Sequence, residues 1–216
     1  MALRAPQMAP RRRNPNRTLP RRLHAITGVV PLGAFLAFHL YANASAAGGA
    51  EAYDATARRL QQAPFAVALE IVLIALPLMF HGVYGLFLLS AEPSGEAHAG
   101  PGRRGLAVFQ RATGVLLFAF ILFHLWTTRL VQVRDHESLD LFHLMQALYA
   151  SPWIRAFYVA GLLAATSHLS AGLWSLADDR GFARTRPARV AVGILAVGVC
   201  AVLSAVGLRS LAAFRL

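Results

Sequence analysis

The chain of 216 residues is 56% hydrophobic and carries a formal net charge of +11. Its apolar residues gather in long blocks, which indicates an integral membrane protein and leaves no room for a soluble catalytic domain. All 21 basic residues are arginine, and they flank the apolar blocks, so the positive-inside rule explains the charge better than nucleic-acid binding does. The single cysteine, Cys200, excludes a disulfide within the chain, a Cys-x-x-Cys-His haem attachment and a cysteine metal site.

The first segment, residues 1–20, is rich in arginine and proline. It has neither a clean apolar core nor a cleavage site, so we do not interpret it as a signal peptide. We expect a disordered cytoplasmic tail instead.

Residues 21–216 are predicted to form an all-α membrane domain, because five apolar stretches are long enough to cross a bilayer as helices. In chain order they cover residues 23–41, 65–89, 106–126, 153–177 and 190–208. Between them, residues 45–62 are expected to be partly helical, and residues 135–151 to form a short amphipathic helix at the interface. A cytoplasmic N-terminus places 14 arginines inside and 7 outside, so we predict an external C-terminus.

The first four spans form an internal repeat. Residues 21–40 (RRLHAITGVVPLGAFLAFHL) resemble residues 110–125 (QRATGVLLFAFILFHL), with Arg, Thr-Gly and Phe-His-Leu in the same order. Residues 63–86 resemble residues 151–173, since both begin with a small residue, proline and an aromatic residue and end with His-x-x-x-Gly-Leu. The first two spans therefore resemble the third and fourth, and the fifth stands apart.

Each repeated span contains one histidine: His39, His81, His124 and His168. At 1.5 Å per residue, His39 and His124 lie about one turn from the outer end, and His81 and His168 roughly 25 Å below it. Facing histidines at one depth of a helix bundle hold a haem iron from both sides. We therefore predict two non-covalent haems b, an outer one and an inner one. Four satisfied intramembrane histidines, or a proton path, are the alternative.

Other polar residues have two interpretations each. Glu70 lies eleven residues before His81, which on an α-helix places it on the same face and about 16 Å further out. It is a candidate proton acceptor beside a quinone, or a partner for an arginine or the backbone. Arg22, His24 and Arg111 at the inner rim are candidates for binding haem propionates, but arginines there also satisfy the positive-inside rule.

Seven motifs carry a family resemblance: RRLHAITG, GAEAYDA, LPLMFHGVYGL, QRATGV, HLWTTR, SPW and HLSAGLWS. From about residue 21 onward the chain resembles the single-chain, five-helix, di-haem cytochrome b anchor of succinate dehydrogenases and fumarate reductases. The resemblance implies that two haems b are held by the histidine pairs derived above. It also implies partners, namely a flavoprotein with FAD and an iron–sulfur protein at the cytoplasmic face, and menaquinone as electron acceptor.

We therefore expect a multi-pass subunit of the cell inner membrane that carries electrons but does not oxidise succinate alone. Some fumarate reductases of this type have a glutamate two residues before the last ligand, where this chain has Thr166. The difference favours the succinate-oxidising direction. The alternatives are a di-haem cytochrome b of another dehydrogenase or of a fumarate reductase, and a haem-free anchor or transporter.

Overall fold

The computed structural model describes residues 18–90, 101–131 and 140–214, and within these ranges it contains helices and no strand. Most of the predicted tail, residues 1–20, lies outside the described residues. Five helical stretches are long and apolar enough to cross a membrane. Four of them extend the predicted spans at both ends, and the second covers Ala66–Ser90 where 65–89 is predicted. The all-α, five-span prediction is confirmed.

The first span consists of two helices, α1 (Leu19–Val29) and α2 (Pro31–Asn43). The break falls at Val30 because Pro31 has no amide hydrogen to donate to the preceding turn. The second span begins after Phe65, which has a positive φ of 60°, and combines α4 (Ala66–Leu69), a π-helical segment (Glu70–Ala75) and α5 (Leu76–Ser90).

The π-helical segment ends two residues before Pro77, which explains it. A proline ring collides with the carbonyl four residues earlier, and the wider turn makes room for that carbonyl. A second π-helical segment, Trp126–Leu130, follows α6 (Pro101–Leu125) in the third span, where no proline lies near the widened turn. There the hydroxyl of Thr128 donates to the His124 carbonyl over 2.6 Å, which supplies a partner for a carbonyl at the widened turn.

The last two spans, α9 (Pro152–Asp179) and α10 (Arg186–Ala213), pack closely against each other. Thr166 is fully buried between them, and its hydroxyl lies 2.8 Å from the Ser204 hydroxyl. The Ser170 hydroxyl donates to the Ala196 carbonyl over 2.7 Å. Small residues and hydroxyls of this kind join membrane helices where no hydrophobic force can do so.

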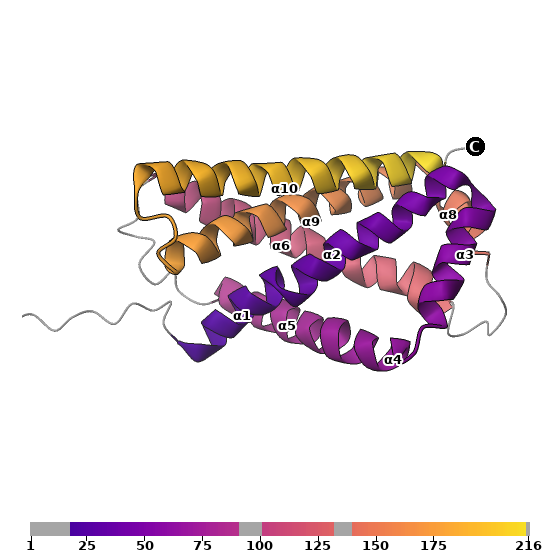
Figure 1. Cartoon of the computed structure of the whole chain (residues 1–216), viewed down its shortest axis with the longest axis horizontal. Helices are drawn as coiled ribbons and strands as arrows, with labels where there is room; N and C mark the ends of the chain where they lie inside the picture. The colour runs from indigo at the N-terminus through magenta and orange to yellow at the C-terminus, as the bar shows by residue number, and fades with distance from the viewer. Residues whose placement is uncertain (1–17, 91–100, 132–139, 215–216) are drawn as a thin grey trace, which may run out of the picture.

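The end of the bundle that the sequence predicts to lie outside, called the outer end below, is covered by short helices: the 3₁₀ turn Ala44–Gly48, α3 (Ala50–Gln61) and α8 (Leu141–Tyr149). Figure 1 shows α3, α8 and the C-terminal end of α10 together at one end, opposite the α9–α10 connection. The amphipathic segments predicted on this side are confirmed as far as they are described. They cover a small core of buried side chains, which are Ala46, Phe142, Met145, Tyr149, Tyr158 and Phe214.

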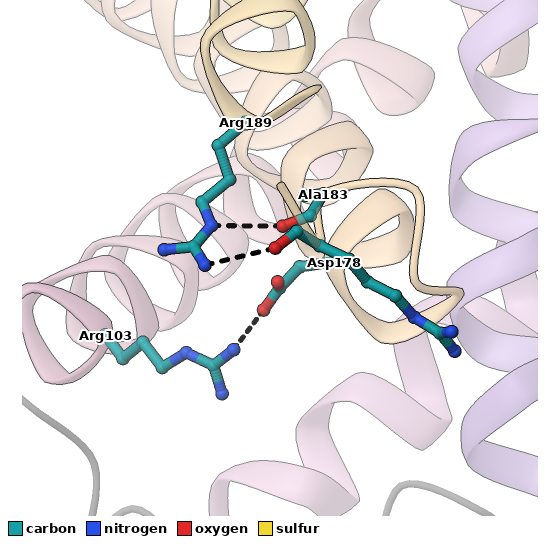
Figure 2. A network of polar contacts seen from close by, with 5 residues as sticks. Arg103, Asp178, Ala183 and Arg189 are labelled. Carbon is teal, nitrogen blue, oxygen red and sulfur yellow. Dashed lines mark hydrogen bonds and ion pairs between the residues drawn. The ribbon is translucent and has the colours of Figure 1, made fainter. Parts of the chain in front are cut away.

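Two arginines hold together the opposite end of the bundle, which is predicted to lie inside and is called the inner end below (Figure 2). Arg103 of α6 forms an ion pair with Asp178 near the end of α9. Arg189 donates from Nε to the Ala183 carbonyl over 3.1 Å, which fixes the α9–α10 connection. Arg103 and Arg189 are therefore part of the folded structure at this end and are not merely solvated charges.

Candidate functional site

One continuous cavity of about 2000 Å³ runs along the inside of the first four spans. It exceeds the roughly 300–1,000 Å³ of an ordinary small-molecule pocket and has room for more than one cofactor-sized ligand. Most of its lining is apolar. Its lining includes the four intramembrane histidines, His39, His81, His124 and His168.

The outer pair joins α2 and α6. The ring centroids of His39 and His124 lie 5.9 Å apart, with their planes at 78°. Tyr158 of α9 lies behind this pair, with its hydroxyl 3.5 Å from Nδ1 of His124 and 3.4 Å from the Thr127 hydroxyl. A partner on Nδ1 leaves Nε2 of His124 as the nitrogen for a ligand in the cavity.

The inner pair joins α5 and α9. The ring centroids of His81 and His168 lie 6.2 Å apart, with their planes at 89°. Nδ1 of His81 lies 2.9 Å from the His24 carbonyl, and Nδ1 of His168 lies 3.2 Å from the Gln110 carbonyl. In both cases a main-chain carbonyl accepts the Nδ1 hydrogen, which directs Nε2 to the cavity.

The spacing of each pair fits one metal ion between two imidazoles. A histidine nitrogen bonds a metal at about 2.0–2.1 Å, and the ring centroid lies about 1 Å further away, so opposite rings have centroids about 6 Å apart. No group of three or more His, Cys, Asp or Glu side chains in the described ranges could hold a bare metal ion. Two imidazoles alone therefore suit a metal whose other ligands come from a macrocycle, such as haem iron.

Two glycines in the cavity wall make room for the inner pair of histidines. A Cβ atom on Gly28 would overlap with the His81 ring, and one on Gly114 would lie 3.1 Å from Cε1 of His168. Glycine at these two points therefore gives each inner histidine the space that it occupies. The Gln110 amide nitrogen lies 3.3 Å from Nε2 of His168, and an iron ligated there would replace this contact.

The predicted propionate-binding residues occupy different places. His24 does not lie at the rim, because its ring stacks on His81 at a centroid distance of 4.1 Å and an angle of 6°. Its Nδ1 is buried without a hydrogen-bond partner among the described residues. Arg111 lines the cavity, as does Arg21, whereas Arg22 is exposed and does not line it.

Glu70 also lines the cavity, although the π-helical segment that it begins breaks the continuous α-helix assumed in the spacing argument. Its carboxylate is held by Arg129, which donates from Nε over 2.9 Å to one oxygen and from Nη2 over 2.7 Å to the other. Both side chains are about two-fifths exposed. Sequence reasoning left an arginine partner open but did not identify Arg129, and it missed Tyr158 altogether.

Comparisons with known proteins agree with this geometry. The family described as "Succinate dehydrogenase/Fumarate reductase transmembrane subunit" matches residues 105–207. The chain is 37% identical over 195 residues to the "Succinate dehydrogenase cytochrome b558 subunit" of Bacillus subtilis, covering 90% of this chain and 95% of that protein. No solved structure gives a significant match.

Proposed function

Since the chain belongs to the family of succinate dehydrogenase and fumarate reductase transmembrane subunits, we propose that it anchors a succinate:menaquinone oxidoreductase and carries its electrons to quinone. The observation that carries this proposal is the pair of facing histidines at each of two levels of one cavity. The similarity to a cytochrome b558 subunit supports the same assignment, because it makes haem b the expected occupant of the cavity.

Under this proposal the chain holds two haems b. His39 and His124 ligate the outer one, and His81 and His168 the inner one. When bound, the haems supply one-electron transfer between an iron–sulfur partner and quinone. The carbonyl partners of His81 and His168 fix the tautomer and orientation of both rings and increase their basicity as ligands. Arg21, Arg111 and His24 are the candidates for binding propionates, since all three line the cavity.

The partners are a flavoprotein that contains FAD and an iron–sulfur protein, which dock at the inner end, and the chain itself oxidises no succinate. The inner end carries Arg103, Arg104, Arg111 and the α9–α10 connection, and Arg103 and Arg189 form bonds that stiffen it. The arginine count supports an N-terminus on the cytoplasmic side of the cell inner membrane.

Menaquinone is proposed to react outside the outer haem, where Glu70 exchanges protons with it. Reducing a quinone to a quinol takes up two electrons and two protons, so a carboxylate at the cavity wall has a chemical role there. Succinate oxidation is the favoured direction, because Thr166 is bonded to Ser204 and faces α10, and therefore offers no proton path along α9. Fumarate reduction remains the second candidate, since the family includes both activities.

The test is haem content together with spectra. We expect two haems b per chain in the purified complex, loss of the inner haem in His81→Ala and loss of the outer haem in His124→Ala. His143→Ala is the matched control, because this histidine lies on α8 and bonds to Asp140 outside the cavity. One haem in the intact protein, or His81→Ala and His124→Ala removing the same spectral component, would overturn the proposal.

A further inference from the structure

The ion pair between Glu70 and Arg129 needs an explanation beyond helix packing. It links the second and third spans, at the edge of the cavity that also contains His39 and His124. A charged pair in a membrane span is costly, and well-packed apolar residues usually hold helices together at least as well. A carboxylate and a guanidinium retained at a cavity wall therefore point to a ligand.

Each residue of the pair lies in a π-helical segment, a feature that is rare and often marks functional sites. On a regular α-helix, Arg129 would lie about 140° around the axis from His124. The wider turn of Trp126–Leu130 reduces that angle and brings the guanidinium round to the side of the histidine. The distortion of the third span thus places a hydrogen-bond donor beside the outer site.

The pair leaves hydrogen-bonding capacity for a further acceptor. A guanidinium has five N–H groups, and the bond to Glu70 uses one on Nε and one on Nη2. Three remain, with two of them on Nη1. The nearby lining from the second and third spans is mainly apolar, including Leu69, Leu73 and Leu125. Thr128 also lines the cavity, but its hydroxyl already donates to the His124 carbonyl. The ligand that matches is a flat, apolar, neutral ring with a carbonyl oxygen at its edge.

We propose that Arg129 donates a hydrogen bond to a carbonyl oxygen of the quinone, while Glu70 holds its guanidinium in place and exchanges the proton. This inference rests on the proposed function and adds a second residue to its quinone site. Two electrons from succinate and two protons from the outer aqueous phase convert the quinone to the quinol. Arg129 keeps all its protons, and its hydrogen bond stabilises the negative charge that develops on the carbonyl oxygen.

The experiment compares Arg129→Gln and Arg129→Lys with Arg155→Gln in the purified complex. Arg155 is the matched control, because it lies near the outer end of α9 but does not line the cavity. Three quantities are measured: succinate oxidation with a soluble naphthoquinone, succinate oxidation with an artificial acceptor, and equilibrium binding of the naphthoquinone to the oxidised complex. Haem content and spectra are recorded for each variant.

For Arg129→Gln we expect a KM for the naphthoquinone and a dissociation constant both raised roughly 10- to 100-fold, the cost of a lost hydrogen bond to a charged group. Arg129→Lys is expected to lie between this variant and the wild type. Haem spectra and the rate with the artificial acceptor should not change, and Arg155→Gln should behave as the wild type.

If the Glu70–Arg129 pair served only to hold the two helices together, these experiments would give different results. In the charge-swapped variant Glu70→Arg/Arg129→Glu the pair can form again, but the donor is moved to the other helix. Normal quinone kinetics in this variant would overturn the proposal, as would normal quinone binding in Arg129→Gln. Loss or shift of the outer haem band in Arg129→Gln would overturn it too, because Arg129 would then act on a haem propionate. Absence of both haems from the wild type would instead overturn the proposed function.

Discussion

Gly28 should be unable to accept even one extra methyl group. A Cβ atom built at this position overlaps with Cε1 of His81 and lies 2.8 Å from its Nδ1, whereas ordinary van der Waals contact begins at 3.4 Å. The His81 ring must therefore move by more than the 0.6 Å that Nδ1 alone requires, and this movement strains its 2.9 Å hydrogen bond to the His24 carbonyl. Overpacking of this kind costs about 1–3 kcal/mol.

In Gly28→Ala that energy should weaken the inner haem site alone, since His81 is its proposed ligand. A cost of 1–3 kcal/mol corresponds to roughly a 5- to 150-fold loss of affinity. We expect lower inner-haem content or a shifted midpoint potential of the inner haem, measured by redox titration of the absorbance bands. The outer haem should keep its potential.

Gly105→Ala is the matched control for Gly28→Ala. Gly105 also lies in a membrane helix, but a Cβ atom there meets nothing within 4 Å. The control should keep both haems and gain up to about 1 kcal/mol of helix stability. If Gly28→Ala titrates as the wild type does, the close approach of Gly28 to His81 has no role in the inner site, and the reasoning fails.

Three further predictions concern other parts of the molecule. Glu70→Gln should keep both haem spectra and the artificial-acceptor rate but slow quinone turnover; normal turnover would contradict its role. Cross-links from the iron–sulfur partner should reach residues near Arg103 and Asp178. Cross-links to Asp54 would show that the partner docks at the opposite end and that the proposed orientation is wrong. Burial raises the pKa of Asp54 above its ordinary 3.8, so its contribution to stability should be complete below that value and lost as pH rises through the raised pKa. Asp54→Asn should remove this dependence from pH-resolved melting curves, while still accepting the hydrogen bond from the Phe142 amide.

The number and length of the spans could be predicted because hydropathy and helix length are properties of the chain alone. The depth of each histidine also follows from a fixed rise per residue. The histidines predicted to share a depth do face each other, His39 with His124 and His81 with His168. What depth does not give is the rotation of a helix about its axis. Glu70 illustrates this, since its predicted face assumed a continuous α-helix through residues that are π-helical.

The contacts around Arg129 and His24 could not be predicted for related reasons. No proline marks the π-helical segment that contains Arg129, and its distance from Glu70 along the chain hides the ion pair. The position of His24 near the start of a span predicts a residue at the rim. The break at Val30 and the packing of α1 against α5 instead place its ring on His81. Both outcomes depend on tertiary packing, which a single sequence does not encode locally.

The internal repeat places the same hydrogen bonds around the two inner histidines, His81 and His168. In each half, the residue three positions before Thr-Gly offers its carbonyl to the histidine of the following span: His24 to His81, and Gln110 to His168. The threonine hydroxyls close the same turns, since Thr27 donates to the Leu23 carbonyl and Thr113 to the Phe109 carbonyl, each over 2.8 Å.

The spacing from that turn to the next histidine differs between the halves. Gly28 lies eleven residues before His39, but Gly114 lies ten before His124. The first span accommodates its additional residue at Val30, where the helix breaks before Pro31. The carbonyl, glycine and threonine around the inner histidine are therefore the same in both halves, while the number of residues from the glycine to the outer histidine differs. For each inner histidine, the repeat thus supplies a carbonyl that accepts its Nδ1 hydrogen, a glycine that leaves room for its ring, and a threonine whose hydroxyl bonds within the same turn. The helix break at Val30 allows the two outer histidines to lie at the same depth.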